Sequence, residues 1–433
     1  MLSMVNRTSV IINKSKLRVA LSLITIVFYC YTRMSFGENI SFRVYFVLGM
    51  LSVAVFWIFS FSRKITVSSM DLFAFLIIFV MFIWNNWDLQ YGAYTSAFNF
   101  TILFMTFMIA SKDDKWMDFV FKISIFFGIF YAFWTIASWI SPNVYYSFVL
   151  PLVEKASIYD LAKQYEQGYM PGMTSHYSTN GLYLSSGITF TLGYYFFDGR
   201  KLTDVSKKGW AIFMFQLFAL LLTGKRGPII YIVVAFIVTY ITYNADKPIT
   251  RYIRVIGIGF AVVIAFFVAS TVVPALGNFV LRFQEAIASG DVSVRRFSLW
   301  GQGWAQFLKH PVLGNGWYWF RYHNLYGQVT YHVHNCYIQW LCELGVVGAI
   351  PFFAFTIISY IRALKILRKV RKHKLDIGTD LMKYISIPLL YETFFVCISF
   401  AGTAFYEAQS LCPYIFCCAY IEYVWKRYKS VLR

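Results

Sequence analysis

The stretch NCYIQWLCELGVVGAIPFFAFTIISYI, residues 335–361, contains one charged residue, Glu343, in an otherwise uncharged and mainly apolar run. A helix of about 20 mostly apolar residues crosses the hydrocarbon core of a bilayer, whereas helices at the surface of soluble domains alternate between apolar and polar faces. The run is too long and too evenly apolar for a soluble core. It therefore predicts a transmembrane helix over 335–360.

Apolar runs of comparable length recur along the whole chain. Of its 433 residues 59% are hydrophobic and only 14% are charged, whereas soluble domains carry about 25% charge. We therefore predict an all-α fold, a polytopic transmembrane helical bundle that forms one integral membrane domain over 1–433. The expected spans, about twelve in number, are 17–33, 44–61, 71–87, 93–110, 118–140, 182–197, 209–223, 227–243, 252–273, 335–360, 384–402 and 405–424.

Basic residues are distributed unevenly between the predicted connections. With the N-terminus placed in the cytoplasm, most of the 39 Lys and Arg residues, including the cluster over 362–374, fall in inner segments. Lys and Arg concentrate on the cytoplasmic side of membrane proteins. We therefore expect both termini in the cytoplasm. The net charge of +19 then requires no nucleic-acid partner.

Two outer connections are too long to be simple turns. The first covers 141–181, and the larger one, which precedes the tenth span, covers 274–334. Long ordered loops often carry function. The larger loop keeps Arg295, Arg296 and Arg321 on the outer side, where basic charge is disfavoured, which suggests that an anion binds there. Contact with lipid headgroup phosphates is the alternative.

The motif His334-Asn335, followed after nine residues by Gly345 and then by Gly348, opens the tenth span. On a continuous helix His334, Gly345 and Gly348 share one face, which would place a polar group at the outer surface above a track of small residues. Imidazole titrates near pH 6.5, so His334 is a candidate general base, with Asn335 and the glycines in support. A histidine anchored to a backbone carbonyl at the interface is the structural alternative.

Two further motifs carry adjacent cations. The turn TGKRGP over 223–228 places Lys225 and Arg226 beside apolar runs, where charge is costly and is usually functional. The larger loop carries Arg295-Arg296 and then a turn, HPVLGNG, over 310–316. The arginine fork matches the geometry of phosphate, whereas arginines that extend toward the membrane surface would have a structural role.

Metal or nucleotide chemistry finds little support in the sequence. His332 and His334 lie two residues apart, but no nearby carboxylate or thiolate completes an obvious ligand set. The seven cysteines lie in or beside apolar segments without a CxxC pair, which favours packing roles. No nucleotide-binding fingerprint is present, and we expect neither a metal nor a cofactor. The aromatic run over 317–322 is compatible with sugar stacking or with an interfacial belt.

Together these motifs resemble a known family of membrane proteins. Arg296-x-x-x-Trp300, the turn over 310–316 and His334-Asn335-x9-Gly345-x-x-Gly348 are similar to the characteristic region of the O-antigen ligase and O-antigen polymerase superfamily. The Lys225-Arg226-Gly227 turn looks like the arginine–glycine turn that precedes this region in the family. The specific motifs cover residues 223–348.

The resemblance implies a C-type glycosyltransferase fold. Such an enzyme transfers a glycan from undecaprenyl diphosphate at the outer face of the bacterial inner membrane, without metal or nucleotide. Carried over to this chain, Arg226 and Arg296 would hold the diphosphate and His334 would activate the acceptor hydroxyl. Arg295 is the alternative to Arg296, and Lys225 would lend support.

We expect a polymerase of O-antigen, capsule or exopolysaccharide, which transfers a glycan from undecaprenyl diphosphate to a lipid-linked repeat unit. The motifs do not separate it from a ligase, because both enzymes share the donor. An O-antigen ligase, which transfers the glycan to the lipid A core, is the alternative enzyme. A transporter or flippase of a lipid-linked anionic sugar is the alternative from a different class. The expected partners are the undecaprenyl-diphosphate-linked oligosaccharide and membrane lipid, with a flippase and a chain-length regulator as accessory proteins.

Overall fold

The computed structural model describes most of the chain. Its continuous described segments are 42–60, 67–86, 91–153, 158–197, 205–246, 296–325, 331–372 and 379–432. Two predicted spans lie outside the described residues: 252–273, and 17–33 apart from a few positions. Arg295 and most of the segment 274–295 of the larger loop lie outside them as well. Within the described segments regular secondary structure is helical, and no strand occurs there. The predicted all-α class is confirmed for this part of the chain.

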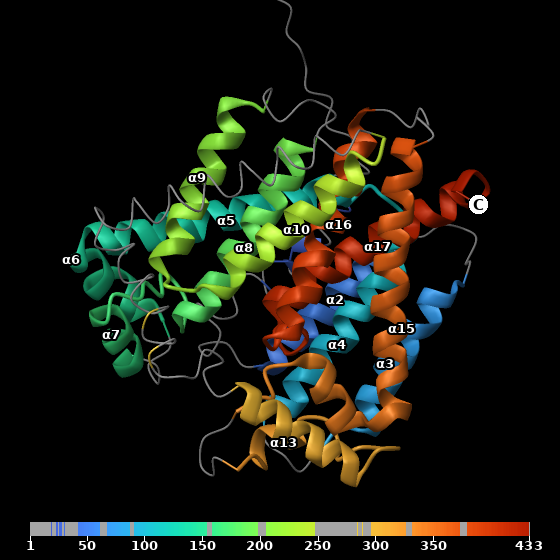
Figure 1. Cartoon of the computed structure of the whole chain (residues 1–433), viewed down its shortest axis with the longest axis horizontal. Coiled ribbons are helices and arrows are strands. Elements are labelled where there is room, and N and C mark those ends of the chain that lie inside the picture. The colour runs from blue at the N-terminus through green and yellow to red at the C-terminus, as the bar shows by residue number, and fades with distance from the viewer. Residues whose placement is uncertain are drawn as a thin grey trace, which may run out of the picture.

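Each predicted span that falls within the described segments coincides with a helix (Figure 1). By length and composition, three helices of the described part could cross a membrane: Met117–Ile140, Cys336–Arg371 and Met382–Phe400. The total number of spans stays a prediction. The longer helices are α2 (Phe42–Ser60), α3 (Ser69–Ile83), α4 (Tyr91–Ala110), α5 (Met117–Ile140), α8 (Tyr177–Phe196), α9 (Lys207–Leu222), α10 (Gly227–Tyr243), α15 (Cys336–Lys372), α16 (Thr379–Phe400) and α17 (Ala408–Leu432).

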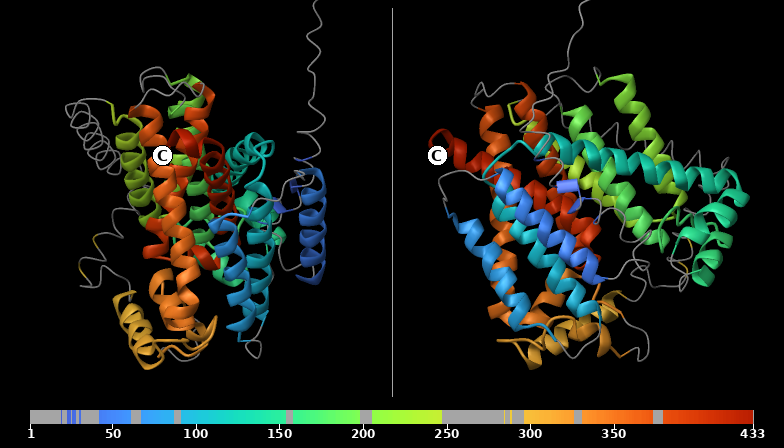
Figure 2. Two further views of the ribbon diagram at one scale, coloured as in Figure 1. Left: turned by 90° about the vertical axis from the view of Figure 1, so that its right-hand side faces the viewer. Right: turned by 180° about the vertical axis from the view of Figure 1, so that it is seen from behind.

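The helices pack into one bundle. Helix α8 packs against α5, α9 and α16, while α16 also contacts α10, α15 and α17. Helix α4 joins α2 and α3 to α17. The first long connection contains α6 (Pro142–Val144), η1 (Tyr145–Val149), η2 (Leu150–Leu152) and α7 (Ile158–Glu166). The larger loop contains α13 (Arg296–Lys309) and α14 (Trp319–Tyr322). Helix α13 lies across one end of the bundle in every view (Figures 1 and 2).

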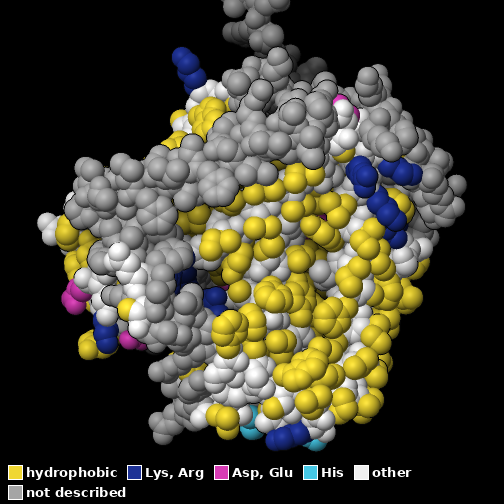
Figure 3. All heavy atoms as spheres, in the orientation of Figure 1, with side chains coloured by type: hydrophobic (Ala, Val, Ile, Leu, Met, Phe, Trp, Pro, Cys, Tyr) yellow, Lys and Arg dark blue, Asp and Glu magenta, His cyan; other side chains and the backbone are white. Residues whose placement is uncertain are grey.

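A broad apolar surface faces outward over α10 and α15. Figure 3 shows hydrophobic side chains across the middle of this face. Ile230 and Val233 of α10 and Val346, Ile350 and Ile357 of α15 are exposed. Soluble monomers rarely expose an apolar patch of this breadth, whereas acyl chains cover such a surface in a bilayer. The surface therefore supports the membrane location.

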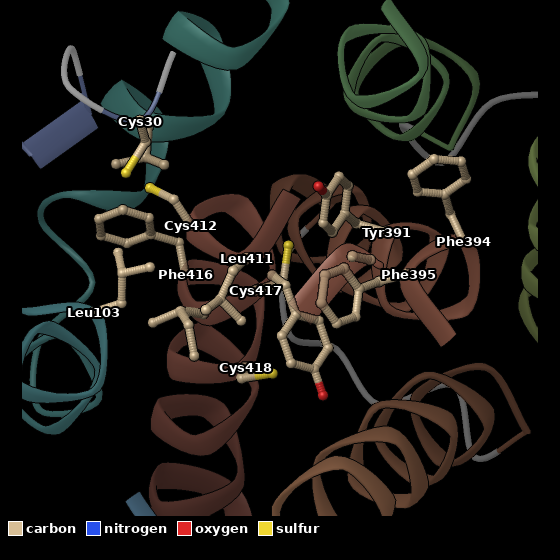
Figure 4. Packing of buried hydrophobic residues seen from close by; sticks show 14 of the residues in the cluster. Cys30, Leu103, Tyr391, Phe394, Phe395, Leu411, Cys412, Phe416, Cys417 and Cys418 are labelled. Atoms are coloured by element: carbon tan, nitrogen blue, oxygen red, sulfur yellow. The ribbon is translucent and has the colours of Figure 1, made fainter. Parts of the chain in front are cut away.

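The centre of the bundle is filled by aromatic and small side chains. Figure 4 shows Cys412, Cys417 and Cys418 of α17 among Phe395 and Phe416. All seven cysteines are free thiols, and six of them are buried. They therefore act as small packing residues, as the sequence predicted.

The helix ends remote from α13 carry buried ion pairs. The carboxylate of Asp71 in α3 pairs with Lys112 and Lys426, and Glu422 in α17 pairs with Arg362 in α15. The basic stretches at the ends of α15 and α17 therefore share one side of the bundle. This arrangement agrees with a cytoplasmic side rich in Lys and Arg, while the orientation in the membrane stays a prediction.

Helix α15 is interrupted at Gly345. This residue has φ 62° and ψ −171°, a conformation that is open mainly to glycine. His334, with φ 56°, precedes the helix, which begins at Cys336. The prediction that His334, Gly345 and Gly348 share one face of a continuous helix is therefore wrong, because the break ends the regular helical turn between them.

Candidate functional site

The turn over 310–316 fills the break in α15. The amides of Asn315 and Gly316 donate to two carbonyls at the end of the first half of α15, over 3.1 and 2.7 Å. In return, the amides of Val346 and Val347, which begin the second half, donate to carbonyls of the same turn over 2.9 and 3.2 Å. Backbone groups freed by the break are thus satisfied inside the membrane domain. The turn therefore ties the outer loop to the tenth predicted span.

Glycines make this close approach possible. A Cβ atom at Gly345 would lie 2.3 Å from the carbonyl oxygen of Val312, and one at Gly314 would lie 2.4 Å from the amide nitrogen of Gly345. Gly348 faces Trp84, directly after α3, where its added Cβ would lie 3.5 Å from the indole. Gly345 thus serves the insertion of the turn, while Gly348 lies at ordinary van der Waals distance from Trp84, and the two glycines do not form one smooth track below His334.

Asn335 caps α15. Its side-chain oxygen accepts hydrogen bonds from the amides of Tyr337 and Ile338, at 3.0 and 3.1 Å, and the residue is buried. Asparagine is among the best N-terminal caps because it satisfies amides that have no partner within the helix. Asn335 therefore sets the point at which the chain turns from His334 into the helix.

His334 has a strained backbone and a side chain that is available for chemistry. Its carbonyl oxygen accepts a hydrogen bond from the indole Nε1 of Trp300 in α13, at 3.3 Å. The imidazole forms no hydrogen bond with any residue that the structure describes. Among the described residues, therefore, no backbone carbonyl anchors the ring as the alternative role requires. A positive φ at a non-glycine residue costs about 1–3 kcal/mol and is typical of functional sites.

Two cations influence the imidazole of His334. Burial lowers the pKa of His334 to about 4, and the positive charges of Arg296 and Lys225 contribute to this lowering. The ring is therefore neutral at neutral pH and keeps a lone pair that can accept a proton. Arg296 begins α13, and its guanidinium lies beside the hydroxyl of Tyr231 in α10. Three segments far apart in the sequence thus converge here.

Lys225 is positioned by α8. Its ammonium lies 5.1 Å from the ring centroid of Tyr177, and a Cβ added at Gly181 would meet the lysine stem at 3.2 Å. Arg226 is the residue directly before α10 and is partly buried. The sequence assigned Lys225 a supporting role only. In the structure the charge of Lys225 reaches His334.

Sequence reasoning missed a carboxylate beside Lys225. Glu407 precedes α17, and its carboxylate accepts hydrogen bonds from the Thr403 hydroxyl and, at 3.0 Å, from the Gln409 amide. The positive charge of Lys225 attracts this carboxylate. Lys225 therefore acts on Glu407 as well as on the histidine. The available signal was an acidic residue inside a predicted span, which is costly unless it has a role.

A second polar network adjoins this site through His332. The Nδ1 atom of His332 lies 2.9 Å from the amide nitrogen of Gln339, which also donates to Glu343 over 2.9 Å. The hydroxyl of Tyr406 donates to the other carboxylate oxygen of Glu343, at 2.9 Å. Burial lowers the pKa of His332 to about 3, and the charge of Arg321 adds to the effect. His332 is therefore neutral and held in a buried network.

The aromatic run over 317–322 belongs largely to the core. Trp317 is fully buried, donates to the hydroxyl of Ser96 at 3.0 Å and stacks on Tyr406 at 4.4 Å between ring centroids. Tyr318 and Phe320 are also buried. These three rings serve neither as a sugar platform nor as an interfacial belt. Their burial fixes the loop that leads to Arg321.

The comparison with protein families agrees with the motifs. Residues 211–353 match the family described as O-antigen ligase. The matched segment includes the turn over 223–228, helix α13, the turn over 310–316 and the first half of α15. A search of curated proteins found no match. The resemblance to the O-antigen ligase and polymerase superfamily is thereby confirmed for this segment.

Proposed function

We propose that this chain, with its O-antigen ligase segment, is a polysaccharide polymerase that transfers a glycan from undecaprenyl diphosphate to a lipid-linked repeat unit. The observation that carries the proposal is a neutral imidazole, His334, under the influence of Arg296 and Lys225. Among the described residues no carboxylate forms an ion pair with Arg296. A proton acceptor can activate a hydroxyl, and the neighbouring cations can bind an anion. Together they suit displacement of a diphosphate leaving group.

The proposed reaction is a single displacement. An acceptor hydroxyl attacks the anomeric carbon of the donor glycan, and His334 takes the hydroxyl proton as the new glycosidic bond forms. The bond between the anomeric carbon and the diphosphate oxygen breaks, and the diphosphate leaves with the electron pair. Arg296, Lys225 and Arg226 would stabilise its charge. Attack opposite to the leaving group inverts the anomeric configuration.

Donor binding would prepare the base. By themselves, the charges of Arg296 and Lys225 disfavour protonation of His334, which makes it a weak base. A bound diphosphate would bring negative charge to both cations and raise the pKa of His334 toward its ordinary value. The histidine would therefore become an effective proton acceptor only when the donor is present.

The two alternative functions differ from the polymerase in separate ways. An O-antigen ligase would use the same donor site but transfer the glycan to the lipid A core. In a deletion strain a single repeat unit on the core indicates a polymerase, and a bare core indicates a ligase. A transporter of a lipid-linked anionic sugar would use the cations but would need no proton acceptor at His334.

The proposed orientation places the site at the outer face of the bacterial inner membrane, with both termini in the cytoplasm. The basic ends of α15 and α17, at the opposite side of the bundle, support it. Lys309 at the end of α13 is exposed. Cysteine introduced at Lys309 should react with an impermeant thiol reagent in intact inner-membrane spheroplasts. Reaction only after permeabilisation would reverse the orientation.

Purified full-length protein tests the chemistry directly. With lipid-linked repeat units as donor and acceptor, wild type should form a product of two repeats, read by mass spectrometry. His334→Gln should keep donor binding and lose turnover by about 10²–10⁴-fold. Arg296→Ala should abolish transfer and Arg296→Lys should restore part of it, because lysine lacks the fork. Lys309→Gln, exposed on the same loop, is the matched control and should leave turnover unchanged.

The outcomes separate the candidate functions. Turnover of His334→Gln equal to wild type contradicts the base assignment. Absence of product from folded wild type that still binds donor favours transport. Product formed only when a lipid A core acceptor is supplied favours the ligase.

A further inference from the structure

The outer loop contains a second basic group that the proposed donor site does not use. Arg321 lies in α14, and its Nη1 donates to the hydroxyl of Tyr318 at 3.0 Å. The guanidinium carbon lies 5.4 Å from the centroid of the Tyr318 ring. The Nε atom is buried without a hydrogen-bond partner. Among the described residues no carboxylate forms an ion pair with Arg321. Partly buried cations normally have an anionic partner, and the described part of the chain supplies no counter-charge for this one.

Backbone strain marks the same place. Tyr318 has φ 70° and His334 has φ 56°, and these are the two non-glycine residues with positive φ in the described part of the chain. The ring of Tyr318 lies edge-on to the ring of His332, with the centroids 5.4 Å apart. Strained conformations persist where the surrounding structure holds them, and they cluster at ligand sites. The ring contact joins the turn before Arg321 to the segment that leads to His334, and each of the two segments contains a strained residue.

Glu343, the carboxylate of the neighbouring network, already accepts several hydrogen bonds. Glu343 accepts hydrogen bonds from Gln339 and Tyr406, both at 2.9 Å, and the backbone amide of Tyr318 also faces it. Glu343 therefore holds the strained turn in place instead of neutralising Arg321. The turn is rigid, and the guanidinium that it carries is oriented in advance, which favours binding of a ligand.

We propose that Arg321 and Tyr318 form a subsite for the carboxylate of an acidic sugar in the acceptor glycan. A planar guanidinium binds a carboxylate through two parallel hydrogen bonds. The inference rests on the proposed transferase function, because it assigns the subsite to the acceptor. Arg321 influences His332, and His332 is influenced in turn by His334. The subsite therefore lies close to the proposed base.

Proximity to the base selects the sugar over a second lipid diphosphate. In a lipid-linked repeat unit the accepting hydroxyl is carried by the terminal sugar, and the remaining sugars separate it from the diphosphate. An anion subsite close to His334 therefore matches a charged group on the accepting sugar or on its neighbour. A carboxylate held by Arg321 would orient that sugar and direct its hydroxyl toward the histidine.

The test compares two probes on purified wild-type protein. The first is methyl glucuronide, with methyl glucoside as the neutral control, and the second is an isoprenyl diphosphate. Saturation-transfer nuclear magnetic resonance should detect methyl glucuronide but not methyl glucoside. Arg321→Gln should weaken glucuronide binding by about 10- to 100-fold, the usual range for a charged hydrogen bond. The same variant should bind the isoprenyl diphosphate as wild type does. Arg296→Gln should weaken binding of the isoprenyl diphosphate and leave glucuronide binding unchanged.

Further variants keep the test decisive if Arg321→Gln does not fold. Tyr318→Phe removes only the hydroxyl that orients the guanidinium and should weaken glucuronide binding. Arg321→Lys keeps the charge without the fork and should give intermediate binding. Lys309→Gln, exposed on the same loop, should change neither probe. Sugar analysis of the native polymer gives a second readout, and an acidic sugar should be present.

Each of the remaining outcomes decides between the acidic-sugar subsite and the donor site. Equal glucuronide binding by Arg321→Gln and wild type, or a native polymer made only of neutral sugars, overturns the acidic-sugar subsite. Diphosphate binding that is lost in Arg321→Gln assigns Arg321 to the donor site and also overturns it. Glucuronide binding without diphosphate binding in wild type would instead contradict the proposed donor site while the subsite stands.

Discussion

Replacing Lys225 by methionine should raise the pKa of His334, because it removes a positive charge and keeps a side chain of similar length. Three causes act in the same direction on this pKa: burial is the largest, the charge of Arg296 comes next and that of Lys225 is the smallest. Together they lower it from 6.5 to about 4. Lys225 is the smallest of the three causes, so Lys225→Met should move the pKa of His334 upward within the interval from about 4 to 6.5.

Arg296→Gln is the matched second perturbation. The charge of Arg296 is the larger of the two electrostatic causes that lower the pKa of His334. Loss of Arg296 should therefore raise the pKa of His334 at least as much as loss of Lys225. The position of Arg296 agrees with this order of the two pKa changes. Arg296 is the first residue of α13, and Trp300 of the same helix donates to the carbonyl of His334.

The assay is the pH dependence of glycan transfer by purified protein. Only the neutral imidazole accepts a proton, so activity falls as the pH decreases through the pKa of His334. The profile of kcat/KM reports the free protein, and its acid limb should lie near pH 4 in wild type and at higher pH in both variants. The profile of kcat reports the donor complex, where the diphosphate offsets the cations. Its acid limb should lie above that of kcat/KM in wild type.

The reasoning is refuted if the acid limb of kcat/KM keeps its position in both Lys225→Met and Arg296→Gln while His334 is still required. A limb that moves to lower pH would refute it equally, because removal of positive charge can only favour protonation. Lys309→Met, exposed at the far end of α13, is the control for net charge and should leave the limb in place.

Three further predictions concern the frame of the site. Gly345→Ala should destabilise the protein by more than about 1–3 kcal/mol, because it combines a positive φ with a steric clash. As the control, Gly301→Ala in the open surroundings of α13 should be neutral or stabilise the protein by up to about 1 kcal/mol. Thermal unfolding in detergent compares the two variants, and equal melting temperatures would contradict the prediction for Gly345→Ala. Asn335→Ala should cost about 0.5–2 kcal/mol through loss of the cap, and Asn335→Asp should keep most of it. Glu407→Gln should tighten binding of an isoprenyl diphosphate, because Lys225 then faces no opposing carboxylate; weaker binding in a titration would contradict this.

The sequence alone determined the membrane-helical class of this protein and the segments that carry its motifs. Hydrophobic length is a local property, so the runs around α5 and α16 could be assigned without any knowledge of their neighbours. The motifs that contain Arg296 and His334 were likewise readable, because each is a short pattern of residues with fixed spacing. In the structure the charge of Arg296 influences His334, while their roles in one site stay a prediction.

Only the tertiary structure decided how the pieces meet. A helical wheel assumes a continuous helix, and it could not show that Gly345 breaks α15 to admit the turn over 310–316, since the hydrogen bonds involved join distant segments. Nor could spacing reveal that Lys225 influences His334 or that Glu407 lies beside Lys225, because packing of α8, α10 and α17 places them. Electrostatic coupling depends on distance and burial, and both are set by the fold of the whole chain.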